Sequence, residues 1–139
     1  MYVMLHTKTA LTVFLLAGMT LWACENQHSY RQGESLYKTH CASCHIDDGL
    51  GLRGVIPPLT GSDYLARDPA HTACIIRNGL QGEITVNGIN YKEPMAAIPQ
   101  LSDFQIANII NYINSAWGND LGYVSVPEIR KRLEECGEQ

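Results

Sequence analysis

Two cysteines and a histidine stand together in the segment Cys41-Ala42-Ser43-Cys44-His45. The two thiols are one helical turn apart, so each can add to one vinyl group of the same haem, and the next residue can offer its imidazole to the iron. The spacing therefore predicts one covalently attached haem c with its iron. Cys41 and Cys44 would carry the covalent bonds, and His45 would be an axial ligand.

Two other kinds of site use cysteines at this spacing. A structural zinc site needs four ligands in a closed tetrahedron, and no second pair of cysteines or histidines follows at metal-ligand spacing. A thioredoxin-like redox pair needs a βαβ context, which the sequence pattern does not provide. The sequence favours haem over both.

Met95 is the first choice for the second axial ligand, because it is the only methionine after the apolar N-terminal segment. It follows Pro94, which stiffens the backbone that would hold the sulfur. A methionine that only fills the core is the alternative interpretation. His71 is an alternative ligand, although the Asp-Pro pair before it predicts a surface position in a first helical turn. His40 is expected to point elsewhere.

Local signals predict the elements that position these residues. Ser29 and Gln32 form a capping-box pattern that opens a helix to about His40. Residues 47–61 are rich in glycine and proline, which predicts a loop. Ser62 can begin a short helical turn.

The second half of the chain has equally clear signals. The Asp-Pro pair at 68–69 and the Asn-Gly pair at 78–79 bound a helix of about ten residues. Residues 84–91 place two β-prone triplets around Asn-Gly, which predicts a hairpin. Ser102 opens the longest helix, in which isoleucines and Trp117 recur at helical spacing before Gly118 ends it.

From Gln32 to Asn119 the chain resembles a class I cytochrome c domain. Gly33 and Tyr37 match positions on the first helix of that family, and Ile109 and Tyr112 match their partners on the last. The resemblance implies that these two helices cross closely, which Gly33 would allow. The positions that match the haem ligands of the family are Cys41, Cys44, His45 and Met95.

The resemblance also implies a role for Pro57. Its carbonyl oxygen would accept the proton on the far nitrogen of His45 and so fix the tautomer of the ligand. A simple stiffening of the loop by Pro57 or Pro58 is the alternative. The fold class expected is all-α, a small cytochrome c fold around one haem, with a short β-hairpin and a C-terminal helical extension.

The N-terminal segment predicts export and a lipid anchor. Residues 1–23 contain an apolar run that is too short to span a bilayer and reads as a signal peptide. The run ends in a lipobox-like junction before Cys24, the expected lipid anchor, with an ordinary secretory signal as the alternative. Residues 24–28 would be a tether, 29–119 the cytochrome domain and 120–139 the extension. The expected location is the periplasmic side of a bacterial membrane.

Cys74 and Cys136 remain after lipid and haem have used the other three cysteines. In an oxidising compartment two remaining thiols are more often paired than free, so a disulfide is predicted. Cys136 would end a short helix opened by Ser125 and Glu128. That helix is so polar that the disulfide is expected to hold it in place.

An iron bound by histidine and methionine has no open site for substrate, so the sequence favours one-electron transfer over catalysis. The expected partners are a redox donor protein, a redox acceptor protein and the membrane. The formal charge of −4 makes nucleic acid a poor partner. No motif indicates a small-molecule substrate or a catalytic residue. The alternatives are a peroxidase-like haem enzyme or sensor with a labile methionine, and an interaction module with a structural haem.

Overall fold

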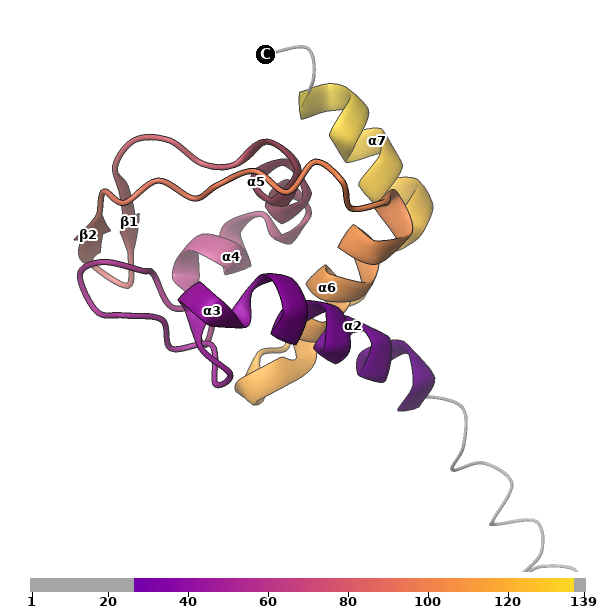
Figure 1. Cartoon of the computed structure of the whole chain (residues 1–139), viewed down its shortest axis with the longest axis horizontal. Helices are drawn as coiled ribbons and strands as arrows, with labels where there is room; N and C mark the ends of the chain where they lie inside the picture. Colours follow the sequence, from indigo (N-terminus) through magenta and orange to yellow (C-terminus); the bar gives the residue numbers. More distant parts are fainter. Residues whose placement is uncertain (1–26, 137–139) are drawn as a thin grey trace, which may run out of the picture.

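The computed structural model describes residues 27–136, which form helices and one two-stranded antiparallel sheet (Figure 1). The predicted signal peptide and Cys24 lie outside these residues. No helix in the described part is both long and apolar enough to cross a bilayer. The elements are α2 (Gln27–His40), α3 (Ala42–His45), α4 (Asp63–Arg67), η1 (Pro69–His71), α5 (Thr72–Asn78), β1 (Ile84–Val86), β2 (Ile89–Tyr91), α6 (Asp103–Ser115), η2 (Ala116–Gly118) and α7 (Val126–Cys136).

Helices α2 and α6 cross at Gly33, as the resemblance implied. A methyl group added at Gly33 would lie 2.7 Å from the Cβ of Tyr112 and closer still to the carbonyl oxygen of Asn108. Glycine is therefore what lets the two backbones approach. Tyr37 lies one turn further along α2 and is fully buried, with its ring 5.4 Å from that of Tyr112.

Capping motifs begin two helices where the sequence predicted them. Ser102 Oγ accepts from the backbone N–H of Gln105, and the Gln105 side chain accepts from the Ser102 backbone. Ser125 and Glu128 make the equivalent pair at α7, where the Ser125 N–H donates to Glu128 Oε2 over 2.7 Å. Helix α2 begins at Gln27, two residues before the predicted cap at Ser29, because the polar residues before Ser29 also tolerate helical backbone.

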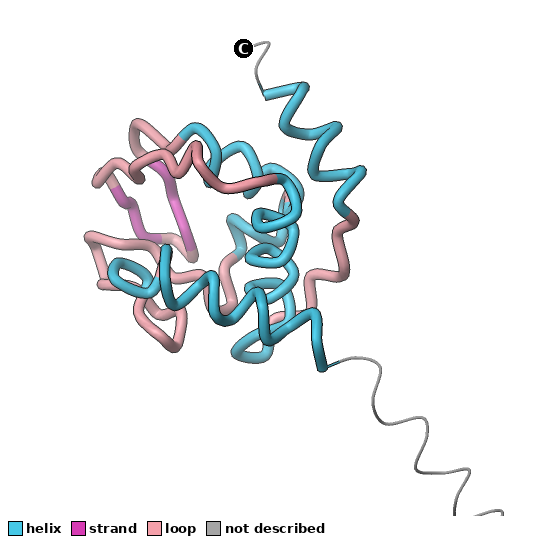
Figure 2. The backbone as a smooth tube through the Cα atoms, turned by 45° about the vertical axis from the view of Figure 1, so that its right-hand side comes forward, coloured by secondary structure: helices cyan, strands magenta, loops and turns pink. Residues whose placement is uncertain are grey.

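The predicted helix after Asp68 is divided in two. A 3₁₀ turn, η1, is capped by the Asp68 side chain, which accepts from the N–H of His71, and α5 follows until Gly79. The hairpin of residues 84–91 is present, with β1 and β2 joined by Asn87 and Gly88, both at positive φ. In Figure 2 the hairpin lies at the end of the molecule away from α7.

Trp117 differs from the prediction, because it does not continue the α6 helix. It lies in η2 with φ of 55°. Its ring packs 5.2 Å from the ring of Tyr37 and its Nε1 donates to the carbonyl oxygen of Asp47 over 3.0 Å. These tertiary contacts stabilise a backbone conformation that helical spacing alone does not predict.

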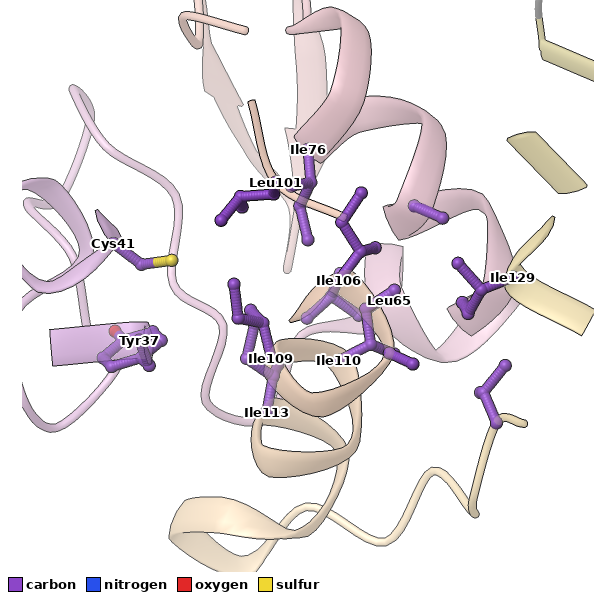
Figure 3. Close-up of a cluster of buried hydrophobic side chains, with 13 residues drawn as sticks. Tyr37, Cys41, Leu65, Ile76, Leu101, Ile106, Ile109, Ile110, Ile113 and Ile129 are labelled. Carbon is purple, nitrogen blue, oxygen red and sulfur yellow. The ribbon is translucent and has the colours of Figure 1, made fainter. Parts of the chain in front are cut away.

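The C-terminal helix contributes to the core, which corrects the expectation that it is too polar to dock well by itself. Ile129 of α7 is fully buried beside the isoleucines of α6 (Figure 3). Before α7, Asn111 exchanges two hydrogen bonds of 2.8 and 2.9 Å with the backbone of Val124. Cys74 and Cys136 form a disulfide, with Cα atoms 5.8 Å apart.

Candidate functional site

The Cys-Ala-Ser-Cys-His motif lies at the end of α2 and on the single turn of α3. The N–H of Cys41 still donates to the carbonyl of Tyr37, while the N–H of His45 donates to the carbonyl of Cys41. This turn gathers both thiols and the imidazole within one short segment. Cys41 is buried, and burial raises the pKa of its thiol to about 11, with the nearby Cys44 as a smaller cause. Cys44 is exposed.

His45 is held in one orientation by the backbone of the following loop. Its Nδ1 lies 3.1 Å from the carbonyl oxygen of Pro57. A carbonyl can only accept, so Nδ1 carries the proton and Nε2 keeps its lone pair for a metal. Burial lowers the pKa of His45, and the bond to Pro57 opposes this effect. The imidazole is therefore neutral and available as a ligand at neutral pH.

A mainly apolar cavity of about 420 Å³ opens beside the motif. Cys41, Cys44 and His45 line it, and so do Met95 and Pro57. Its volume is within the usual range of a site for an organic cofactor. The other walls come from the loop after α3, from α4, α5 and the hairpin; they include Leu59, Leu65, Ile75, Val86 and Tyr91.

Met95 lines this cavity, whereas His71 does not. His71 lies in η1 and borders two smaller hollows, one between α5 and α7 and the other between α4 and α5. The arrangement favours Met95 over His71 as the residue that can approach a group in the cavity. His40, expected to point elsewhere, does line the cavity, because it immediately precedes the buried Cys41 at the end of α2.

The segment that carries Met95 is paired with the end of α5. Met95 and Leu80 form an isolated antiparallel bridge. Gly79, next to Leu80, lies against the Met95 carbonyl. Sequence reasoning interpreted Gly79 only as a helix stop and did not find this pairing. Gly79 has a positive φ of 80°, which a glycine that ends a helix also adopts. The sequence therefore carried no separate signal that Gly79 also makes room for the Met95 backbone.

The residues of this cavity fit a covalently bound haem. Two thiols could bond to the vinyl groups of a haem, a neutral imidazole could offer Nε2 to its iron, and a thioether lines the same apolar space. Within residues 27–136, no group of three or more His, Cys, Asp or Glu side chains is arranged to hold a metal ion. The fold and the site define a c-type cytochrome domain.

Comparison with known proteins shows the family. The cytochrome c family model matches residues 30–117, and the chain belongs to the cytochrome c family. Its cofactor is therefore haem c with its iron, and its function is electron transfer. The chain is 34% identical over 116 residues to cytochrome c-552 of Thermus thermophilus, an alignment that covers 81% of this chain and 73% of the relative.

Other relatives are cytochrome subunits of dehydrogenases. The cytochrome c subunit of the quinone alcohol dehydrogenase of Gluconobacter oxydans is 32% identical over 105 residues, covering 71% of this chain and 21% of the subunit. The gluconate 2-dehydrogenase cytochrome c subunit of Pantoea cypripedii is 30% identical over 117 residues, covering 81% and 25%. The chain thus spans at most about a quarter of these subunits.

Proposed function

We propose that this protein is an exported, lipid-anchored monohaem cytochrome that passes single electrons, as a carrier or as the electron-entry subunit of a respiratory or periplasmic oxidoreductase. The observation that carries the proposal is that His45 and Met95 line the same apolar cavity as Cys41 and Cys44. Haem bound by these residues supplies a one-electron couple between ferric and ferrous iron. If His45 and Met95 both bind the iron, no coordination position would be left for a small-molecule substrate.

The side chains around the cavity have separate tasks in this proposal. His45 binds through Nε2, because Pro57 holds the proton at Nδ1. Met95 offers a soft sulfur, which favours the ferrous form and raises the potential. The apolar walls of the cavity exclude water, which also favours the ferrous form and raises the potential.

The partners proposed are one redox protein that donates electrons and another that accepts them. The relatives that are subunits of dehydrogenases support an electron-entry role, and the shorter cytochrome c-552 supports a carrier role. The membrane is the third partner, through lipid on Cys24. The apolar run before Cys24 and its lipobox-like junction support export to the periplasmic side.

Spectra and redox titration of the purified holoprotein test the electron-transfer role. We expect low-spin spectra, a reversible one-electron couple and, in the ferric form only, the weak near-infrared band of methionine ligation. Met95→Ala should abolish the band and lower the potential. Lys92→Ala, an exposed change in the same segment, is the matched control and should leave both unchanged. If the band and the potential survive in Met95→Ala, Met95 is not the ligand.

The same measurements separate the other functions. A ferric wild-type protein that lacks the band and binds peroxide or another small ligand readily would indicate a haem enzyme or sensor. A protein without a reversible couple would indicate a structural haem.

Fractionation of cells tests the anchor. Wild-type protein should remain with membranes and its mature N-terminus should be a lipid-modified Cys24. Cys24→Ser should be released or left unprocessed, while Asn26→Ser should behave as wild type. A mature wild-type N-terminus at any residue after Cys24 would rule out the anchor.

A further inference from the structure

We propose that Gly79 and Leu80, which directly follow α5, are positioning residues that hold Met95 in place as the axial ligand. The proposal rests on the proposed function, since it assumes that Met95 binds the iron. Leu80 fixes the backbone of Met95, and Gly79 provides the space in which that backbone lies. Neither residue needs to contact the iron.

Leu80 and Met95 exchange both of their main-chain hydrogen bonds. The N–H of Leu80 donates to the Met95 carbonyl over 3.0 Å, and the N–H of Met95 donates to the Leu80 carbonyl over 2.9 Å. This narrow pair of bonds fixes the position of the Met95 Cα, from which the thioether extends. The residue that would bind the iron is therefore tied to a helix end fifteen positions earlier in the chain.

Gly79 makes this close pairing sterically feasible. A Cβ atom placed on Gly79 would lie 2.6 Å from the carbonyl oxygen of Met95 and 3.0 Å from the N atom of Ala97. Real Cβ atoms do not tolerate the shorter of these distances, so any side chain would push the Met95 segment away from α5. The backbone of Gly79 is also at φ 80° and ψ −178°, a region that is essentially restricted to glycine.

A third hydrogen bond fixes the segment beyond Met95. The N–H of Ile98 donates to the carbonyl of Ile76 over 2.9 Å. Ile76 is buried in α5, and Cys74 of the same helix is joined to α7 by the disulfide. The methionine segment is thus laid against a helix that is itself fixed by the core. This arrangement preorganises the sulfur instead of leaving its position to the metal.

Gly79→Ala in the holoprotein is the direct test, with Gly54→Ala as its matched control. Gly54 has the same φ of 80°, but a Cβ there would meet nothing within 4 Å. The readouts are the near-infrared band of ferric methionine ligation, the reduction potential, and the affinity of the ferric protein for added imidazole, which competes with Met95.

We expect Gly79→Ala to weaken the band, lower the potential and bind imidazole about 10-fold more tightly or better, the scale of losses when the support of a metal ligand is removed. Gly54→Ala should match wild type in all three. If Gly79→Ala also matches wild type, or if the two variants change equally, Gly79 does not position Met95. If wild type itself lacks the band, the ligand assignment fails instead, which distinguishes the two proposals.

Amide hydrogen exchange gives a second test that does not require Gly79→Ala to fold. It is measured on wild type and on Met95→Ala, both carrying haem. If the backbone pairing holds the Met95 segment independently of the iron, the amide of Leu80 stays protected when the sulfur is removed. The reason is that this amide donates to the backbone carbonyl of residue 95. Loss of that protection in Met95→Ala would mean that the iron organises the segment, and would overturn the proposal.

Discussion

The Nδ1 atom of His45 lies 3.1 Å from the carbonyl oxygen of Pro57, and Gly51 packs against the same carbonyl. A Cβ at Gly51 would lie 2.7 Å from the Pro57 oxygen, and Gly51 has φ of 62°. The N–H of Gly51 also donates to the carbonyl of His45 over 3.0 Å. The loop that follows the motif thus holds His45 at two points, the carbonyl of its backbone and the Nδ1 atom of its ring.

Gly51→Ala should raise the reduction potential of the holoprotein. Displacing the Pro57 carbonyl weakens the bond from Nδ1, which makes the imidazole a poorer donor and stabilises ferric iron less. The expected rise is at most about 40 mV, which for one electron corresponds to the loss of about 1 kcal/mol of hydrogen bonding. Spectroelectrochemistry measures it.

Gly61→Ala is the control for this prediction. Gly61 has a similar φ of 58° and nothing within 4 Å of its added Cβ. A fall in potential for Gly51→Ala, or an equal shift in both variants, would show that the carbonyl does not tune His45.

The α2–α6 crossing predicts that Gly33→Ala destabilises the fold. Alanine is better than glycine in a helix by about 1 kcal/mol, yet its methyl group would collide with Asn108 and Tyr112. Overpacking of this kind costs about 1–3 kcal/mol, so we expect a net loss in the free energy of unfolding. Denaturant titration measures the loss. Gln32→Ala, at an exposed position of the same helix, should be neutral, and equal stabilities of the two variants would contradict the close crossing.

The features that were predictable from the sequence are those set by neighbouring residues. The attachment motif needs only one helical turn, and the caps at Ser102 and Ser125 each use a partner three residues away. The Asn-Gly pair likewise predicts the hairpin turn from adjacent residues, and in the structure Asn87 also exchanges two hydrogen bonds with Asp63.

The features that were missed depend on the packing of distant segments. Leu80 pairs with Met95 through backbone hydrogen bonds, so the residue types at these two positions do not indicate the pairing. Trp117 leaves the helix because Tyr37 and Asp47, far away in the sequence, hold its ring. The polar pattern of α7 concealed Ile129, which is fully buried and reaches the core together with the partly buried Val126 and Leu133.

Tyr37 connects α2 to Ile46, the residue after His45. Its Oη donates to the carbonyl oxygen of Ile46 over 2.6 Å, and burial is the largest cause that raises the pKa of its phenol well above 10.0. The folded state therefore keeps its proton where the unfolded state loses it. Its contribution to stability is complete below about pH 10 and declines as the pH rises above that value.

Tyr37→Phe should lower the free energy of unfolding at pH 7 by about 1 kcal/mol, because the Ile46 carbonyl loses its donor. Above pH 10 the difference from wild type should shrink, since phenylalanine has no proton to lose. Denaturant titrations between pH 7 and pH 11 measure both effects. Tyr123→Phe, whose side chain is 71% exposed, should follow wild type throughout, and a difference for Tyr37→Phe that stays constant with pH would contradict the burial argument.

The C-terminal helix is attached to the rest of the protein both by a disulfide and by packing. Variants can separate these two contributions. The disulfide of Cys74 and Cys136 spans 62 positions, which in the chain-entropy model corresponds to about 4 kcal/mol. Ile129 is fully buried, and Arg132 lies 3.3 Å from the carboxylate of Asp68. The packing contacts do not depend on the sulfur atoms.

The double variant Cys74→Ser, Cys136→Ser should therefore lose up to about 4 kcal/mol of unfolding free energy and yet keep α7 in place. Amides near Ile129 should remain protected from hydrogen exchange, while those near Cys136 should exchange faster. Ile129→Ala, with the disulfide intact, should cost about 2–5 kcal/mol and release the middle of the helix instead. Loss of protection along all of α7 in the double variant would mean that the disulfide alone holds the helix, and alkylation of both cysteines in unreduced wild type would mean that they are not paired.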